Sequence, residues 1–332
     1  MYGLNTLRGL GLSLRARRYR SIGRYNRDML AAAFGAWKFS SSRENLVRWA
    51  LMRRDLGWPV SQRIAKRLVD ILPKLGYRYS LQLISLVAEK YPQYLEGVSK
   101  VLLKKAASRF PALYGLVDSC ENSHHALRLI GRMQNEWRLA FSDAVYAAVS
   151  KAGLSVVGNA SELRTTQLEA QIDMCDLVVR FNHYGRGVEL QACVGSKTDV
   201  WVMSPAYRGP PPTCVPKWVV VSGPAMEYKL QDWGVIQSLI EQGSKVLTVP
   251  LNIWAGCVQQ LEAPPSAGVL ILYWLKSILK SNQQIIFVAG VGMHSKGGVY
   301  HLVDKRYSAV SRHNWVAESA WLEQWSELRR LD

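Results

Sequence analysis

Six short apolar runs in the second half of the chain constrain its fold more than any other feature. Each run has four or five residues and is bounded by turn or loop residues; the runs are 154–157, 177–181, 199–203, 218–222, 245–249 and 285–289. Helical stretches such as 266–279 lie between them. Buried strands that alternate with helices are typical of a mainly parallel sheet covered on both faces. The sequence therefore predicts a Rossmann-like α/β domain over residues 151–332.

Residues 41–150 carry a different pattern, in which apolar side chains recur three and four positions apart. Ile64, Leu68, Ile71 and Leu72 form one such series, which is typical of an amphipathic helix. Turn-forming residues interrupt the pattern at 57–59, 73–76, 91–92 and 110–111. We therefore expect an all-helical module over 41–150, preceded by a basic arm over 1–40.

Basic side chains are concentrated in the first half of the chain. The net charge is +17; residues 1–150 hold 25 basic and 10 acidic side chains, whereas residues 151–332 hold 17 and 15. Residues 1–27 contain seven arginines and no acidic residue, with leucines interleaved from Leu4 to Leu14. Three interpretations of this arm stay open: an amphipathic segment on an anionic membrane, a solvated tail and an Arg-rich transit peptide. We expect no nucleic-acid partner.

Two features bear on the compartment. The first uncharged apolar stretch, Met29–Trp37, is far shorter than the roughly 20 residues that a membrane-spanning helix needs. The chain has five cysteines with no Cys-x-x-Cys pair, at positions 120, 175, 193, 214 and 257. An odd set without metal-like spacing favours free thiols in a reducing compartment. We expect a cytoplasmic protein whose membrane contact, if any, is peripheral.

Polar residues follow two of the predicted strands at the point where each ends. Gly158 and Asn159 come directly after the first run, and Asn182 follows the second, which contains Arg180. Ligands of open α/β sheets bind at the carboxyl ends of the strands. A small residue followed by an amide suits the close approach of backbone to a phosphate or ribose. We expect these side chains to converge on one crevice.

The stretch 156–198 contains these residues within a longer series. It reads Val-Val-Gly-Asn at 156–159, Leu-Arg at 163–164, Ile-Asp at 172–173, Asp176, Arg180, Asn182 and Val-Gly-Ser-Lys-Thr at 194–198. Its order and spacing resemble the large sialylmotif of glycosyltransferase family 29, the eukaryotic-type sialyltransferases. The Gly-Ser-Lys-Thr segment is not a P-loop, because the glycine spacing of that motif is missing.

Three further blocks resemble family motifs in the family's order, so that the resemblance covers roughly 152–320. Pro-Ser-Ala-Gly at 265–268 looks like the small motif, usually Pro-Ser-Thr-Gly. Ala267 departs from that pattern, so one hydroxyl contact to the nucleotide is missing. Tyr300 and His301 are similar to the third motif. His313, with Glu318 five residues later, matches the last motif.

The resemblance implies a GT-A-variant, sialyltransferase-like fold and an inverting transfer. Sialic acid or a related ulosonic acid would move from its cytidine-monophosphate (CMP) donor to a hydroxyl of a glycan or glycolipid. His313 would be the general base, since an imidazole with a pKa near ~6.5 suits that task near neutrality. His301 would donate a hydrogen bond to the leaving phosphate, with Tyr300 as the second candidate for this role. Glu318 and Arg180 would have supporting roles.

The resemblance also implies a donor-binding set and the absence of metal. The donor-binding residues would be Gly158, Asn159, Asn182, Ser266, Ala267, Gly268 and Tyr300. The sequence has no Asp-x-Asp pair to hold a divalent ion, so we expect no metal and no cofactor besides the donor. Members of the family carry a membrane anchor and a disulfide that links the large and small motifs. No cysteine lies near Leu154 or near 279–280, which points to a soluble, bacterial-type member.

Two alternatives stay open. The donor could instead be the CMP derivative of 3-deoxy-octulosonic acid (CMP-Kdo), because the nucleotide-binding blocks would look alike. In a different class, the basic first half would bind a membrane or nucleic acid, and the α/β half would be a degenerate transferase.

Overall fold

The computed structural model of the chain describes residues 2–56, 58, 60–88, 90–107, 113, 125–184, 188–204, 207, 209–223, 233–279, 286–291 and 313–331. The chain forms two compact units. The helical unit comprises Met1–Arg132, Trp254–Pro264 and Ser311–His313. The α/β unit comprises Met133–Ile253, Pro265–Val310 and Asn314–Asp332.

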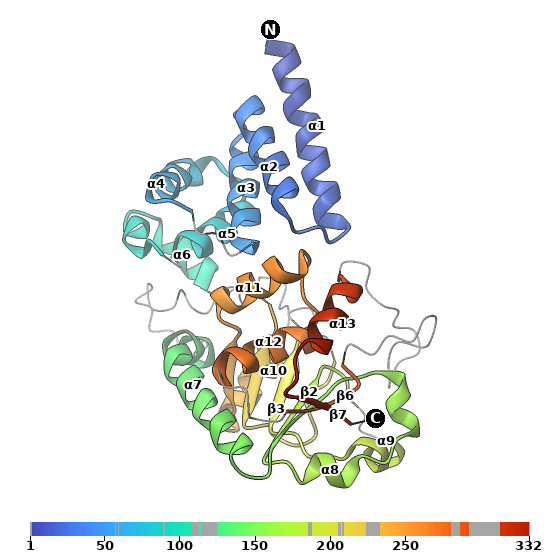
Figure 1. The fold of residues 1–332 in the computed structure, drawn as a ribbon. Helices are drawn as coiled ribbons and strands as arrows, with labels where there is room; N and C mark the ends of the chain where they lie inside the picture. Colours follow the sequence, from blue (N-terminus) through green and yellow to red (C-terminus); the bar gives the residue numbers. More distant parts are fainter. Residues whose placement is uncertain are drawn as a thin grey trace. The chain divides into compact units, whose positions relative to one another are not determined.

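Seven parallel strands form the sheet of the α/β unit in the part of the chain that the structure describes (Figure 1). They are β1 (Leu154–Val157), β2 (Leu177–Phe181), β3 (Val200–Met203), β4 (Trp218–Val221), β5 (Lys245–Thr248), β6 (Ile286–Ala289) and β7 (Leu328–Arg330). Their spatial order is β5-β4-β3-β2-β1-β6-β7. The prediction of a Rossmann-like α/β fold is confirmed, and β1 to β6 lie within one residue of the predicted runs.

The last strand, β7, was not predicted. It has three residues, none of them buried, and two are arginines. It pairs with β6 at the edge of the sheet. An edge strand with exposed charged side chains has no apolar run to indicate it.

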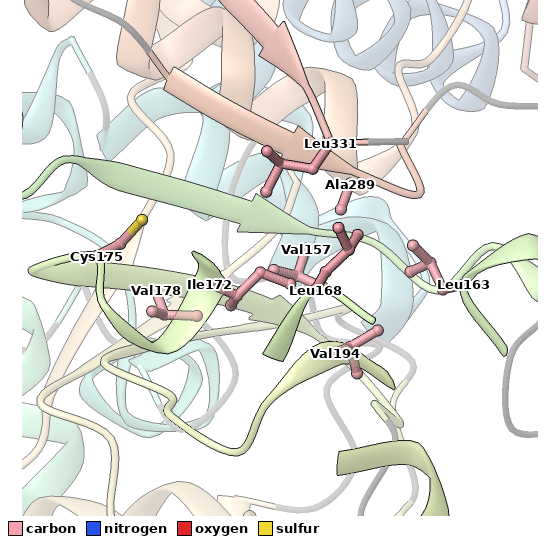
Figure 2. Close-up of a cluster of buried hydrophobic side chains, with 9 residues drawn as sticks. All are labelled: Val157, Leu163, Leu168, Ile172, Cys175, Val178, Val194, Ala289 and Leu331. Carbon is pink, nitrogen blue, oxygen red and sulfur yellow. The ribbon is translucent and has the colours of Figure 1, made fainter. Parts of the chain in front are cut away.

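Helices cover both faces of the sheet. One face packs on α8 (Glu169–Asp173), α9 (Val188–Val194) and the 3-10 turn η5 (Ser161–Thr165). Figure 2 shows the buried cluster on this side, formed by Val157, Leu163, Leu168, Ile172, Cys175, Val178, Val194, Ala289 and Leu331. The cluster joins β1, β2 and β6 to η5, α8 and α9.

The other face packs on α7 (His125–Val149) and α12 (Ala267–Leu279), as Figure 1 shows. The ring of Phe141 in α7 lies 5.5 Å from that of Trp218 in β4 and 5.0 Å from that of Trp274 in α12. Two further helices of this unit are α10 (Trp233–Glu241) and α13 (Trp315–Glu323). Because α7 packs on the sheet, the α/β unit begins at Met133, which differs from the predicted boundary after residue 150.

Six helices and two 3-10 turns make up the first part of the helical unit in the described residues. They are α1 (Tyr2–Ser21), α2 (Arg27–Ser40), α3 (Arg43–Asp55), α4 (Gln62–Ile71), η1 (Leu72–Lys74), α5 (Tyr77–Ala88), η2 (Pro92–Leu95) and α6 (Lys100–Ala107). Asn26, Ser42 and Ser61 cap α2, α3 and α4, because each side-chain oxygen accepts a backbone N–H three residues on. A later helix, α11 (Leu251–Leu261), belongs mostly to this unit.

The described part of the basic arm, 2–40, differs from a solvated tail, because it forms α1 and α2. These helices pack closely. A Cβ on Gly9 would lie 2.9 Å from the Ser40 Cβ, and one on Gly35 would lie 2.8 Å from a Leu12 methyl. Among the described residues, no helix has both the length and the apolar character that crossing a bilayer requires.

The outer edge of β5 is covered by two side chains of α7. Gln134 accepts the backbone N–H of Thr248 at 3.0 Å and donates to the Val246 carbonyl at 2.8 Å. Arg138 donates to the carbonyl of Thr248 at 3.0 Å and to its hydroxyl at 2.6 Å. Backbone groups on an open sheet edge would otherwise recruit another strand. The two side chains therefore take the place of a neighbouring strand.

We predict that Gln134→Leu lowers the free energy of unfolding by about 1–3 kcal/mol, because it leaves two backbone groups of β5 without partners. Urea denaturation measures this difference. The matched control is Gln237→Leu, at an exposed position where the amide donates only to Glu241. Equal stability of the two variants would contradict the assignment.

Candidate active site

The sheet of the α/β unit has one topological switch point, between β1 and β6. From β1 the chain adds β2 to β5 on one side, and β6 returns on the other side. The crevice outside the carboxyl ends of two such strands is where open α/β sheets bind ligands. Gly158 follows β1 directly, and Gly290 follows β6. The first predicted site residue therefore lies at the switch point.

The two strand ends touch through their backbones. The Gly158 N–H donates to the Ala289 carbonyl at 2.7 Å, and a Cβ on Gly158 would lie 2.0 Å from the Gly290 carbonyl oxygen. Gly290 has a φ of +61°, in the region that favours glycine. Position 158 therefore requires glycine because the two strand ends are in contact. From the sequence we expected a different reason for this glycine, the close approach of the backbone to a phosphate or ribose.

The small motif reaches the same place from α12. A Cβ on Gly268 would lie 2.7 Å from a methyl of Val291, the residue after Gly290. Ser266 and Ala267, at the start of α12, are half-buried. Through Gly290 and Val291, the structure links the strand end of the large motif to the helix start of the small motif.

The two predicted amides lie at neighbouring strand ends. Asn159 donates from Nδ2 to the Phe181 carbonyl at 2.8 Å, whereas its Oδ1 is buried with no hydrogen-bond partner. Asn182 has a φ of +43°, and its Oδ1 accepts the Ser204 N–H at 2.8 Å. A non-glycine residue held in the left-handed region is typical of a functional site. Of these two side chains, Asn159 can offer a ligand its Oδ1, which would accept a hydrogen bond from an N–H or O–H group.

Arg180 lies inside the protein and is fully buried. Its guanidinium donates to the carbonyls of Lys197 and Val194, each at 2.7 Å, and lies 3.6 Å from a carboxylate oxygen of Asp173. Burial lowers the pKa of Arg180, and the Asp173 charge opposes that shift. The contacts of Arg180 are structural, since they attach β2 to the segment 194–197.

The Gly-Ser-Lys segment surrounds the Asp173 carboxylate. Asp173 accepts the N–H groups of Ser196 at 2.8 Å and Lys197 at 3.1 Å. Gly195 has a φ of +74°, and a Cβ there would lie 2.2 Å from an Asp173 oxygen. Successive backbone N–H groups form an anion-binding concavity, but here the anion is an internal side chain. The structure thus gives a physical reason against a phosphate at this segment.

Glu318 lies in the first turn of α13 and is fully buried. Its Oε1 accepts the backbone N–H of Ser266 at 2.7 Å, and its Oε2 is buried without a partner. Burial raises the pKa of Glu318 to about 7, and the hydrogen bonds from Ser266 oppose the rise. The Glu318 carboxylate is therefore directed toward a backbone amide.

His313 belongs to the helical unit and is half-buried. Its Nδ1 lies 2.7 Å from the Pro264 carbonyl oxygen. A carbonyl can only accept, so Nδ1 carries the proton and the neutral ring has its lone pair on Nε2. A base needs that tautomer if Nε2 is to take the proton. The chain passes between the two units after Pro264 and again after His313.

A family model described as glycosyltransferase family 29 (sialyltransferase) matches residues 148–240. Residues 148–240 are therefore similar to glycosyltransferase family 29. The resemblance of their motifs to family 29 is confirmed, and the matched stretch contains Gly158, Asn159, Arg180 and Asn182. The small, third and last motifs lie outside it.

Among solved structures, the chain is similar to a mammalian sialyltransferase in complex with Gal-beta-1-3GalNAc-ortho-nitrophenol. The two share 18% sequence identity at a TM-score of 0.41, over 64% of this chain and 87% of that one. A second structure of a mammalian sialyltransferase is similar at 17% identity and a TM-score of 0.40, over 71% of this chain and 96% of that one. No curated protein sequence matches the chain.

Two predicted residues of the family 29 site, Tyr300 and His301, lie outside the described residues, together with the rest of the third motif. One candidate was missed. His183, directly after Asn182, has its Nδ1 3.3 Å from the Tyr207 hydroxyl, which donates to the Pro210 carbonyl at 2.9 Å. The sequence could have indicated His183 as a site residue, because it follows Asn182 in the loop that begins at the end of β2.

We predict that Glu318 makes stability fall as pH rises. Its folded pKa of about 7 is above the unfolded value of 4.5, so the folded state holds a proton that the unfolded state has lost. The contribution is fully present below pH 4.5 and is lost as pH rises through about 7, a change of up to about 3 kcal/mol.

Urea denaturation at several pH values, on the wild type and on Glu318→Gln, measures this change. The substitution keeps an oxygen for the Ser266 N–H and removes the titration. The difference in unfolding free energy between the two proteins should therefore change across this window. Parallel pH profiles for the two proteins would contradict the prediction.

Proposed function

We propose that the protein is an inverting glycosyltransferase that moves sialic acid, or a related ulosonic acid, from its CMP donor to a glycan hydroxyl. One observation carries the proposal: the family 29 stretch places Asn159 and Asn182 at neighbouring strand ends beside the switch point. The family supports sialyl transfer in general. The donor, the base and the stereochemistry are our inference.

The donor side of the proposal rests on the contacts at the strand ends. Asn159 Oδ1 is a buried acceptor without a partner, and a cytidine ribose or amino group supplies the O–H or N–H that would satisfy it. Gly158 leaves room for the Gly290 carbonyl, and Gly268 leaves room for the Val291 side chain; the bound nucleotide would lie beside these two contacts. Asn182, Ser266 and Ala267 complete the proposed lining.

The acceptor side rests on His313. With Nδ1–H donated to Pro264, Nε2 would take the proton of the acceptor hydroxyl while its oxygen attacks the anomeric carbon. The bond from that carbon to the phosphate oxygen breaks, and the electron pair leaves with CMP. Attack from the face opposite the leaving group inverts the configuration. His301 and Tyr300 are proposed to stabilise the departing phosphate.

Glu318 is proposed as a positioning residue, because it binds the Ser266 N–H and so holds the first turn of α12. The leaving group is a monophosphate and the sequence lacks an Asp-x-Asp pair, so we propose catalysis without metal or cofactor. The four cysteines that the structure describes are free thiols, at positions 175, 193, 214 and 257. We therefore propose a reducing, cytoplasmic compartment. The proposed acceptor is a glycan or a glycolipid.

Offering CMP-sialic acid and CMP-Kdo separately, with a panel of galactose-terminated acceptors, tests the reaction. We expect CMP release and a product one sugar acid heavier with CMP-sialic acid, and undiminished turnover after treatment with EDTA. Turnover with CMP-Kdo alone would establish the alternative donor. Failure with both donors would favour the degenerate transferase, and chelation that metal reverses would contradict the metal-free proposal.

Two substitutions should separate binding from chemistry. His313→Ala should lower kcat by about 100- to 10,000-fold, the range for losing a general base, and leave the affinity for CMP almost unchanged. Asn159→Ala should raise the Kd for CMP by roughly tenfold, because the lost acceptor contacts the nucleotide. Calorimetry and single-turnover kinetics measure the two effects.

The matched control is His125→Ala, a histidine outside all four motifs. Circular dichroism should show that each variant retains the wild-type fold. The assignment of His313 is wrong if its substitution weakens CMP binding as much as it slows turnover.

A further inference from the structure

Helix α1 has two faces with different compositions. One face packs on α2 and α3 through small side chains. Gly9 lies against Ser40, Ala16 is 2% exposed, and the Ser13 hydroxyl donates to the Asn45 side chain at 3.3 Å. Small residues permit this close approach between helices. Helix α1 therefore packs in the helical unit without the leucines of its opposite face.

The opposite face, here called the leucine face, consists of Leu4, Leu7, Leu10 and Leu14. Their exposed fractions are 74%, 68%, 57% and 56%. Residues three and four positions apart lie on one side of a helix, so the four side chains form one stripe. Isolated exposed leucines are ordinary, but a continuous stripe on one helix marks an interaction surface.

Arginines flank the leucine face. Arg8, Arg15, Arg17 and Arg18 are exposed, and α1 contains no acidic residue. The Arg15 guanidinium donates to the Tyr19 hydroxyl at 2.8 Å, and that of Arg8 lies 5.6 Å from the centre of the Phe39 ring. Aromatic side chains hold the guanidinium groups of Arg8 and Arg15. Because α1 has no acidic residue, no side chain of this helix neutralises its positive charge.

We infer that the leucine face binds a bilayer containing anionic lipid, with α1 lying in the plane of the headgroups. An apolar stripe with flanking cations is the pattern of interfacial helices. Anionic headgroups attract the arginines while the leucines enter the acyl boundary. The inference goes beyond the proposed transfer and does not depend on it.

A second copy of the chain is the competing occupant. Leu4, Leu7 and Leu14 fit the a and d positions of a heptad, which could pair two α1 helices. In a parallel pair on this heptad, Arg18 would occupy an a position and would lie against Arg18 of the second copy in the seam. Repulsion between these charges opposes pairing and favours an anionic surface.

Flotation of the full-length protein with vesicles tests the inference. One set contains phosphatidylcholine alone, and the other contains phosphatidylcholine with phosphatidylglycerol in about a two-to-one ratio. We expect binding to the anionic set only, weakened by salt. The triple variant Leu7→Gln/Leu10→Gln/Leu14→Gln should lower the partition coefficient by roughly tenfold or more. Arg15→Gln/Arg17→Gln/Arg18→Gln should lower it similarly and weaken the salt dependence.

Two matched controls have the same chemistry elsewhere in the chain. Leu139→Gln replaces a leucine that is 69% exposed on α7, and Arg329→Gln/Arg330→Gln removes two exposed charges from β7. Both controls should bind vesicles as the wild type does. Equal loss in the controls, equal binding to neutral vesicles, or dimerisation that the leucine variant abolishes without vesicle binding would overturn the inference.

A soluble acceptor separates this inference from the proposed function. The leucine variant should release CMP at the wild-type rate with that acceptor while it fails to float with vesicles. If the wild type floats but no donor is turned over, the membrane inference stands and the proposed function fails.

Discussion

The backbone contact between Gly158 and Gly290 is the constraint on which the rest of the α/β unit depends. At this point the strands that the chain adds on one side of β1 meet the strand that returns on the other side. A side chain at 158 would enter the Gly290 carbonyl, so the two strand ends can come together only without one. This contact brings the Asn159 end of β1 and, through Val291, the start of α12 to the carboxyl edge of the sheet.

Much of the large motif forms internal structure. Asp173, Arg180 and the segment 194–197 bond to one another: the guanidinium donates from Nε and Nη2 to main-chain carbonyls, and the carboxylate accepts main-chain N–H groups. The Nη1 of Arg180 is buried without a hydrogen-bond partner. A buried cation is tolerated only when paired and hydrogen-bonded, so these residues depend on one another. The residues that remain for a ligand are the two asparagines and their neighbours at the strand ends.

The last motif makes two short hydrogen bonds, one to the small motif and one to the residue before it. Within the helical unit, His313 bonds to Pro264. Within the α/β unit, Glu318 bonds to Ser266. The first bond sets the tautomer of the proposed base, and the second holds the first turn of the helix that begins the small motif.

The sequence by itself determined the class of the α/β unit, six of its seven described strands and the similarity of residues 148–240 to family 29. Buried parallel strands leave continuous apolar runs, and an amide at a strand end can be read from its neighbours in the chain. Only the tertiary structure decided what depends on long-range contacts. Those are the edge strand β7, the packing of α7 on the sheet, the structural use of Arg180 and the left-handed Asn182. They also include the face of α1 on which its leucines lie, because periodicity defines a stripe but not the side that packs against α2.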